Sequence, residues 1–458
     1  MNQDWFYLSL IKGLAFAIIF GSLLGCNSNS PADKAVADVS TTKARATIVD
    51  VEAGIRQYIK AKTEADSGYF SIVNDSTNLS LRLVRVHTEY LSVLDSNSFF
   101  ACVDLADTKG DVYDVDFFLS GTPENMQVTE TTVHKLNGRP FYTWQQNPDK
   151  TWQRQPANPS NTKLIGVIEG QDIFEFYYQV ELPEINDAAQ LWLPIPQSDN
   201  FQTIEVLNIE SPVAHQELSD EQYSNRIFYA QLSPEHSHKT ITLSYSVQRK
   251  EKSAYEEESP TGASALAPSI LLPTGGRFKT MVDEILQGKQ QETDLVKARA
   301  LYDYVSGNLR YAKQGKYGTG DANYACDSKS GNCTEFHSLF ISLARTAGIP
   351  ARFAIGAAIP SERNEGGVNG YHCWAEFYAD GKWWPVDISE ANKYTALSTY
   401  YFGHHPANRI EFSRGRDLKI NPGPKAGAIP FMAYPILEVA GKTAKVKTTF
   451  SFQRQAAL

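Results

Sequence analysis

Residues 331–350 read GNCTEFHSLFISLARTAGIP, and this stretch decides the fold of the region around it. Its apolar side chains recur at helical spacing, so one face of a helix is expected to be buried. Asn332 is a good N-cap residue, and Glu335 three positions later completes a capping-box pattern. Gly348 suits the left-handed residue that ends many helices. The sequence therefore predicts a helix that begins at Cys333.

Cys333 is expected in the first turn of this helix, where backbone N–H groups have no partner within the helix. These groups and the helix dipole favour a thiolate over a thiol. The same N–H groups could bind an oxyanion. The alternative is a buried structural cysteine, because cysteines are often core residues.

A second stretch, residues 370–387, reads GYHCWAEFYADGKWWPVD and predicts a β-hairpin that turns at Asp380-Gly381. If the two strands pair directly across this turn, Asp387 lies opposite Trp374. His372 is two residues from Trp374 and so lies on the same face, as a diagonal neighbour of Asp387. The hairpin can therefore present a His–Asp pair. A histidine with a purely structural role is the alternative.

A cysteine needs a base to be a good nucleophile at neutral pH, and the base needs a group that fixes its tautomer. Cys333, His372 and Asp387 supply these three residue types. Their separation along the chain does not by itself place the cysteine beside the histidine.

The two stretches together resemble the core of the transglutaminase-like superfamily, over about residues 298–388. The helix followed by residues 348–352, GIPAR, is especially similar. The resemblance implies a papain-like α+β core in which Cys333 is the nucleophile, His372 is the base and Asp387 orients the base. No cofactor is expected.

The chain departs from that family at the oxyanion donor. In animal transglutaminases a tryptophan upstream of the cysteine helps to stabilise the oxyanion, whereas this sequence has no tryptophan between Trp192 and Trp374. The second oxyanion donor is therefore open. Tyr311, Gln314 and Asn323 are candidates, and the alternative is that all three are solvated loop residues.

Four further motifs are weaker candidates for a functional role. His337 is interpreted as structural, because a second base on the nucleophile's own helix would be redundant. Cys373 follows His372 on the predicted strand, so its side chain is expected on the opposite face and in the core. His404-His405 has no clustered ligands nearby in the sequence, so no metal site is expected. Trp383-Trp384 could line a substrate groove or pack the hairpin core.

The N-terminus predicts export. The apolar run 13–24 is too short to span a bilayer and suits the h-region of a signal peptide. The sequence LLGC at 23–26 resembles a bacterial lipobox, which implies that residues 1–25 are removed and that Cys26 is lipidated on the periplasmic side. A plain signal peptide or a short anchor is the alternative. Residues 26–45 are expected to form a tether, and Asn27 favours the outer membrane.

Changes in pattern along the chain predict four further segments and a linker at 249–268. Helical spacing and then strand-like runs indicate an α+β unit, compared here with cystatin-like or NTF2-like folds. Regular short strands next indicate a small β-sandwich. The segments are 46–160 for the α+β unit, 163–250 for the sandwich, 269–400 for the transglutaminase-like core and 401–458 for a β-rich C-terminal extension.

The net charge and the cysteine count limit the classes of function and fold that are expected. The net charge is −9 and no basic stripe is evident, so nucleic acid is not an expected partner. With Cys26 and Cys333 set aside, three of the five cysteines remain, so at most one disulfide can form. The sequence predicts thiol-dependent acyl transfer on protein or peptide substrates through a Cys333 thioester, as a cysteine peptidase, amidase or transglutaminase. The alternative is a catalytically silent envelope lipoprotein that binds or scaffolds.

Overall fold

The computed structural model describes residues 46–66, 68–74, 77–95, 97–158, 164–257 and 265–455. The predicted signal peptide, the tether and Cys26 lie outside the described residues. Within the described ranges, no helix is long and apolar enough to cross a membrane.

The first unit is a helix on an antiparallel sheet. Helix α1 (Ile48–Ala65) begins after the N-cap Thr47, which forms a capping box with Asp50. A six-stranded meander follows in chain order, formed by β1 (Phe70–Asn74), β2 (Thr77–Val93), β3 (Ser98–Ala106), β4 (Val112–Thr122), β5 (Asn125–Leu136) and β6 (Arg139–Pro140). A separate hairpin comprises β7 (Tyr142–Gln146) and β8 (Trp152–Pro156).

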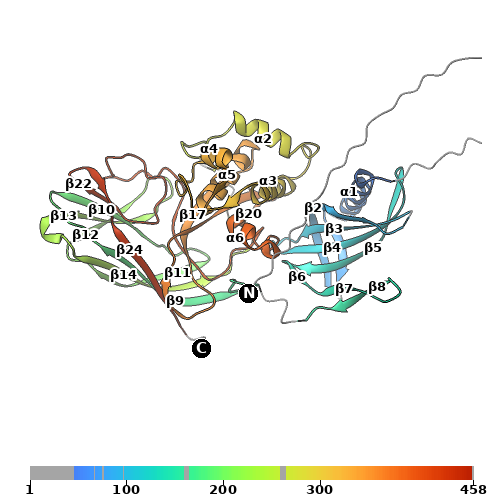
Figure 1. Cartoon of the computed structure of the whole chain (residues 1–458), viewed down its shortest axis with the longest axis horizontal. Helices are drawn as coiled ribbons and strands as arrows, with labels where there is room; N and C mark the ends of the chain where they lie inside the picture. Colours follow the sequence, from blue (N-terminus) through green and yellow to red (C-terminus); the bar gives the residue numbers. More distant parts are fainter. Residues whose placement is uncertain are drawn as a thin grey trace, which may run out of the picture. The chain divides into compact units, whose positions relative to one another are not determined.

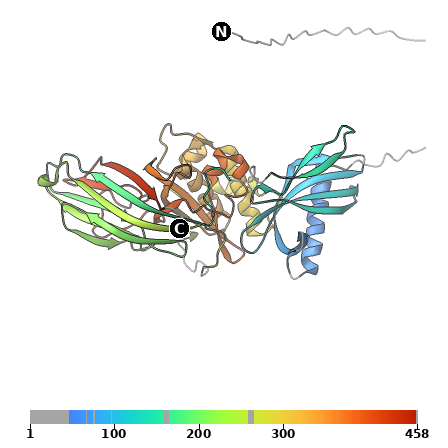
Figure 2. The ribbon, with the colours of Figure 1, turned by 90° about the horizontal axis from the view of Figure 1, so that it is seen from below.

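One face of this meander is apolar and packs against α1 (Figure 2). Val51, Ile55 and Ile59 recur once per helical turn and are all buried. Val103 and Val115 face them from β3 and β4, because side chains of a strand alternate between two faces. The predicted helix and meander are therefore present, and the likeness to cystatin-like or NTF2-like folds stays a prediction.

A β-sandwich of two five-stranded sheets follows. One sheet has the order β12 (His215–Ser219), β13 (Arg226–Leu232), β10 (Ala189–Ile195), β22 (Ile436–Val439) and β23 (Lys442–Ala444). The other has the order β11 (Gln202–Glu210), β14 (Thr240–Lys250), β9 (Gln171–Glu181), β24 (Lys447–Arg454) and β18 (Glu365–Val368). The short 3-10 helix η2 (Pro234–His236) lies between β13 and β14.

The sandwich departs from the predicted boundaries. The sequence predicted a sandwich from residues 163–250 and a separate extension at 401–458, but strands of both segments share the same sheets (Figure 1). β24 pairs with β9 from end to end, and its Phe450 and Phe452 are buried. Without β24, β9 would be an edge strand with unpaired backbone groups. The C-terminal strands are thus part of the sandwich.

The third unit combines helices with a four-stranded antiparallel sheet (Figure 1). Its helices are α2 (Arg277–Ile285), α3 (Asp294–Asn308), α4 (Ala322–Ser328), α5 (Cys333–Thr346), α6 (Ile388–Lys393) and the 3-10 helix η4 (Thr395–Leu397). The sheet has the order β20 (Lys382–Val386), β19 (His372–Ala379), β17 (Ala351–Ala358) and β21 (Arg409–Arg414). Two short strands, β15 (Arg310–Tyr311) and β16 (Ser330–Gly331), pair in parallel. Helices beside antiparallel sheets confirm the predicted α+β class.

Helix α5 is the best buried element of this unit. Every residue from Cys333 to Arg345 is buried, and the helix packs against β17 and β19 and against α2, α3, α4 and α6. Burial on all sides exceeds the single apolar stripe that the sequence predicted.

The predicted linker at 249–268 is only partly a linker. Its residues 258–264 lie outside the described residues, but Lys252 and Tyr255 are fixed to the third unit. The backbone N–H of Lys252 donates to the carbonyl of His405 at 2.8 Å, and Tyr255 exchanges two backbone hydrogen bonds with Trp383. The buried Lys252 Nζ also lies 2.8 Å from Oε1 of Glu376. The charged composition of this segment predicted a linker, but its residue Lys252 is one partner of a buried ion pair.

Candidate active site

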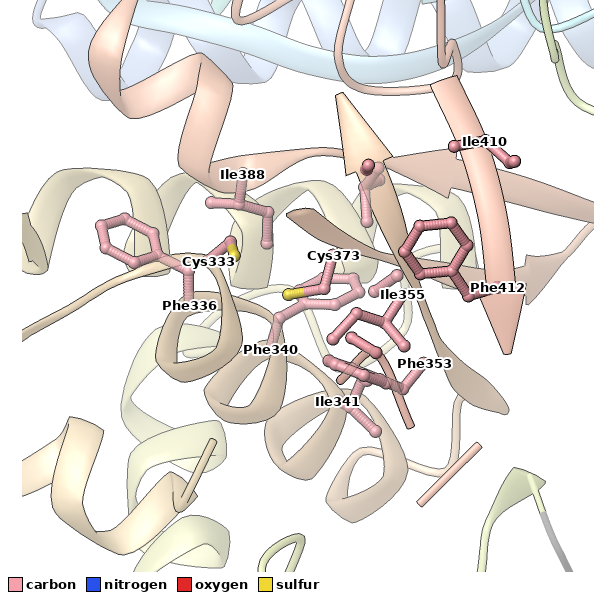
Figure 3. Close-up of a cluster of buried hydrophobic side chains, with 14 of the residues drawn as sticks. Cys333, Phe336, Phe340, Ile341, Phe353, Ile355, Cys373, Ile388, Ile410 and Phe412 are labelled. Atoms are coloured by element: carbon pink, nitrogen blue, oxygen red, sulfur yellow. The ribbon is translucent and has the colours of Figure 1, made fainter. Parts of the chain in front are cut away.

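Helix α5 presents Cys333 at its first residue, as predicted. Asn332 accepts a hydrogen bond from the backbone N–H of Thr334 at 2.9 Å, and Glu335 accepts one from the backbone N–H of Asn332 at 3.0 Å. This capping box fixes the first turn. Cys333 is 2% exposed and belongs to a cluster of buried side chains (Figure 3).

Strands β19 and β20 bring a histidine and an aspartate together. Ala379 is opposite Lys382, which is the predicted register. Asp380 and Gly381 form the turn with positive φ angles of 54° and 80°. Nε2 of His372 donates a hydrogen bond to Oδ2 of Asp387 at 2.6 Å. The prediction that these two side chains share a face is therefore confirmed.

Asp387 is also the N-cap of α6. Its Oδ1 accepts hydrogen bonds from the hydroxyl of Ser389 at 3.0 Å and from the backbone N–H of Glu390 at 3.2 Å. Its Oδ2 remains for His372. Because the carboxylate is fully buried and held at both oxygens, it fixes the orientation of the imidazole.

The side chains of Cys333 and His372 lie close enough to interact, since each shifts the pKa of the other. Since Nε2 of His372 is bonded to Asp387, Nδ1 is the nitrogen that remains for the sulfur. Helix α5 and the β19–β20 hairpin thus join the three predicted residues into one chain of contacts. A nucleophile, a base and an orienting carboxylate in this order are the requirements of covalent acyl transfer.

Residues 279–388 match the family model described as the Transglutaminase-like superfamily. This part of the chain is a transglutaminase-like domain. The family match supports a thiol-dependent kind of enzymatic function.

Three other similar proteins match between half and two thirds of this chain, at 25% sequence identity or less. An uncharacterized protein of Haemophilus influenzae is 25% identical over 334 residues, which are 62% of this chain and 90% of that protein. A candidate cysteine protease from Cytophaga hutchinsonii has 16% identity and a TM-score of 0.41, over 63% of this chain and 99% of that chain. The periplasmic domain of TgpA from Pseudomonas aeruginosa has 14% identity and a TM-score of 0.27, over 51% of this chain and 92% of that chain.

The electrostatics of the transglutaminase-like domain favour an ion pair. Burial opposes ionisation of Cys333, but hydrogen bonds from Cys373 and His372 and the imidazolium charge lower its pKa to about 6. Burial also opposes charge on His372, yet Asp387 and Cys333 raise its pKa to about 9. The same imidazolium holds the pKa of Asp387 below its usual range despite burial. At neutral pH the favoured form is thiolate and imidazolium.

His337 joins the two halves of the site. Its Nδ1 donates to the carbonyl oxygen of Cys333 at 2.8 Å, and its Nε2 accepts the backbone N–H of Ile388 at 3.0 Å. Burial lowers its pKa to about 4, so the ring is neutral at physiological pH. The structural interpretation from the sequence agrees with these contacts. The connection that His337 makes between the start of α5 and the residue after Asp387 was not predicted, because it joins segments that lie far apart in the sequence.

Cys373 is a core residue, as predicted, but it also interacts with Cys333. Its side chain is fully buried, and its side chain and backbone N–H both help to lower the pKa of the Cys333 thiol. Its sulfur lies 3.6 Å from Nδ1 of His337. Burial and the neighbouring thiolate raise the pKa of Cys373 well above that of a free thiol. The described cysteines Cys102, Cys326, Cys333 and Cys373 are all free thiols.

Tyr371 and a glycine-containing loop contact the start of α5. The hydroxyl of Tyr371 accepts a hydrogen bond from Nδ2 of Asn332 at 2.9 Å. Oε1 of Glu335 accepts the backbone N–H groups of Gly318 and Gly320, at 2.9 and 2.8 Å. A side chain at Gly318 would stand 3.4 Å from the hydroxyl of Tyr371. The capping glutamate thereby ties this loop to the start of α5.

The predicted oxyanion candidates separate in the structure. Burial raises the pKa of the Tyr311 phenol, and the charge of the nearby Cys333 adds to this effect, so that the pKa is about 12. Gln314 accepts a bond from Tyr324 through its carbonyl, and Asn323 donates its backbone N–H to Asp321. Neither contact leads to the nucleophile. Tyr311 is the one of these three candidates that lies beside the site.

The remaining motifs belong to the core. Trp383 and Trp384 are 2% and 3% exposed, which favours packing over a substrate groove. His405 is fully buried and packs against Trp374 at a tilted angle, with ring centroids 4.2 Å apart. Nε2 of His404 lies 3.3 Å from Oδ1 of Asp111. These histidines therefore do not converge on a shared point.

Proposed function

We propose that this chain catalyses thiol-dependent acyl transfer on peptide or carboxamide substrates through a Cys333 thioester. The observation that carries the proposal is the buried series in which Cys333 interacts with His372, and His372 is hydrogen-bonded to Asp387. Nucleophile and base act in this scheme as one unit, oriented by the carboxylate.

The thiolate attacks the carbonyl carbon, and a C–S bond forms while the carbonyl electrons move to oxygen. The Asn332 cap accepts the backbone N–H groups of Thr334 and Glu335, so the backbone N–H of Cys333 is the proposed donor of this turn for the oxyanion. The imidazolium of His372 gives its proton to the leaving nitrogen, the C–N bond breaks, and a thioester and an amine result. Neutral His372 then takes a proton from the second nucleophile, which attacks the thioester and regenerates thiolate and imidazolium.

The second nucleophile decides between two activities. Water gives a peptidase or an amidase, and a primary amine gives a transglutaminase. The test incubates the purified chain with a peptide library, with and without a labelled primary amine. Cleavage, deamidation or amine incorporation that disappears in Cys333→Ala supports the proposal, and equal rates in Cys333→Ala overturn it.

A non-catalytic binding or scaffolding role is the second candidate. It is favoured by the 2% exposure of Cys333, because a substrate carbonyl must reach the sulfur. The discriminating measurement is labelling of Cys333 by iodoacetamide near neutral pH. Fast labelling supports the enzyme, and a Cys333 that resists labelling while the chain stays folded supports the binding role.

The chain is also proposed to work at the cell envelope, anchored through a lipid on Cys26 and facing the periplasm. The support is the short apolar run that ends in LLGC at residues 23–26, and Asn27 favours the outer membrane. Mass spectrometry of the membrane-bound protein tests this. A lipid on Cys26 of the wild-type protein, and loss of membrane attachment in Cys26→Ala, would support the anchor. A membrane-bound chain that retains Met1 would contradict it.

A further inference from the structure

Four side chains with metal-binding atoms converge on the sheet face that does not contact α1. They are Cys102 on β3, Asp114 and Asp116 on β4, and His134 on β5. The Cys102 sulfur and Nδ1 of His134 each lie 3.4 Å from Oδ1 of Asp116. Nδ1 of His134 lies 3.9 Å from Oδ1 of Asp114. The donor atoms of Cys102, Asp114 and Asp116 all lie within 4.8 Å of one another.

Strand pairing builds this cluster. Cys102 is directly opposite Asp116 in the β3–β4 ladder. Between β4 and β5 the register shifts, because Asp114 faces Lys135 while the next residue, Val115, faces Val133. His134 is therefore the extra residue of a β-bulge, and bulges commonly redirect a side chain.

Outer contacts hold the two aspartates and His134 so that one atom of each points inward. Oδ2 of Asp116 accepts the hydroxyl of Tyr142 at 2.7 Å and Nε1 of Trp144 at 3.1 Å. Nε2 of His134 lies 3.1 Å from the carbonyl oxygen of Tyr142, so Nε2 carries a proton, and in the neutral ring Nδ1 has the lone pair. Lys135 donates to Oδ2 of Asp114 at 3.1 Å. Metal-binding histidines and carboxylates are usually fixed in this way by a second layer of partners.

In the part of the chain that the structure describes, two of the four inward atoms lack a hydrogen-bond partner, whereas the Cys102 sulfur donates to Oδ1 of Asp116. Among the described residues, neither Oδ1 of Asp114 nor Nδ1 of His134 has a hydrogen-bond partner of good geometry, although both atoms are buried. Asp114 is 7% exposed and Asp116 is fully buried. Buried acceptors that face one another are costly unless a cation or a proton lies between them.

We propose that Cys102, Asp114, Asp116 and His134 bind a divalent transition-metal ion, with zinc as the expected ion. Zinc bonds of about 2.3 Å to sulfur and about 2.0–2.2 Å to nitrogen and oxygen place neighbouring ligands of a tetrahedron about 3.3–3.6 Å apart. The two 3.4 Å separations at Asp116 match that edge. Four protein ligands leave no open position, which is the pattern of a structural site.

The charges also balance. Two carboxylates and a thiolate contribute three negative charges, which the metal ion and Lys135 neutralise. The Cys102 thiol therefore loses its proton to solvent when the sulfur–metal bond forms. The sequence alone predicted no metal, since the four ligands span residues 102–134 without a compact spacing.

The test uses the full chain carrying Cys333→Ala, so that the nucleophile contributes no thiolate. After EDTA treatment, the protein is loaded with Zn²⁺ or Co²⁺ alone and desalted. We expect one retained zinc per chain, a higher thermal midpoint with zinc, and a thiolate-to-cobalt charge-transfer band. Adding Cys102→Ser should remove this band, whereas Cys326→Ser, at a buried thiol outside the cluster, should leave it unchanged.

Two results would overturn the inference. One is retention of well below one metal ion per chain in the Cys333→Ala protein. That result would mean that a protonated His134, and not a metal ion, neutralises the two aspartates. The other is a cobalt spectrum that Cys102→Ser does not alter. If Cys102→Ser fails to fold, His134→Gln replaces it, and unchanged zinc stoichiometry in that variant also overturns the site. None of these outcomes depends on the acyl-transfer proposal.

Discussion

At Cys333, burial and neighbouring groups act on the thiol in opposite directions. Burial alone would keep the proton, but Cys373 and His372 outweigh it and lower the thiol pKa to about 6. At His372, burial is outweighed by Asp387 and Cys333, and the imidazole pKa is raised to about 9. Thiolate and imidazolium therefore coexist between about pH 6 and about pH 9.

The first prediction is a bell-shaped dependence of kcat/KM on pH. The acid limb near pH 6 reflects protonation of the Cys333 thiolate, and the alkaline limb near pH 9 reflects loss of the His372 proton that the leaving nitrogen needs. Iodoacetamide labelling, which needs only the thiolate, should rise through the acid limb. A parallel Cys333→Ala sample measures labelling of the other thiols. Labelling that rises only near a free thiol's pKa of about 8.5 would contradict the ion pair.

The second prediction ranks the three site residues. Cys333→Ala should abolish turnover, and His372→Ala should cost nearly as much, because the losses of a nucleophile and its base do not add. Asp387→Asn should keep roughly tens of times more activity, since the carboxylate orients the imidazole and stabilises its charge. Asparagine is chosen because it can still cap α6. Initial rates of the three variants provide the measurement, and an Asp387→Asn protein less active than His372→Ala would refute the assigned roles.

Among the elements, the hairpin was the most predictable part of the site. The Asp380-Gly381 turn and the two-residue period of a strand fix which side chains share a face, so the pairing of His372 with Asp387 followed from the sequence. The meeting of α5 with this hairpin did not follow, because it depends on packing between segments distant in the sequence. Cys373 and His337 were underestimated for the same reason, since their partners lie on other elements.

The third prediction concerns the connection between α5 and the loop before it. Glu335 accepts backbone N–H groups from Asn332, Gly318 and Gly320. Glu335→Ala leaves these donors without their acceptor, at about 1–3 kcal/mol for each one that stays buried. The variant should unfold at a lower temperature and should label faster at Cys333, because the loop is released.

Thermal unfolding and alkylation rates measure the two effects of Glu335→Ala together. Glu362→Ala serves as the control, because its side chain is 73% exposed and lies outside the site. If Glu335→Ala lowers stability without changing the labelling rate, the loop does not limit access to the sulfur.

For the whole molecule, the strand patterns indicated a sandwich but not its full membership. Alternating burial along β9 and β14 is a local signal that a single sequence reveals. The partners of β9 are long-range, and β24 follows it by more than two hundred residues. No periodicity records which strand lies next to which, so the C-terminal strands were assigned to an extension of their own.

This shared sheet links the end of the chain to the site. β24 pairs with β18, which ends at Val368 shortly before His372. Phe450 of β24 also stacks on Tyr434 with ring centroids 5.6 Å apart. The hydroxyl of Tyr434 accepts the backbone N–H of Tyr371 at 3.3 Å. The C-terminal strand therefore supports the residue that precedes the base.

The last prediction follows from that support. Phe450→Ala removes a ring that is 3% exposed and should destabilise the chain by about 3–5 kcal/mol. Tyr434 then loses its stacking partner, so turnover should fall even at temperatures where the variant remains folded. Thr449→Ala on the exposed side of the same strand is the matched control and should change neither property. Thermal unfolding and initial rates below the transition measure both effects, and a folded Phe450→Ala protein with unchanged kcat would show that β24 stabilises the sandwich without positioning the base.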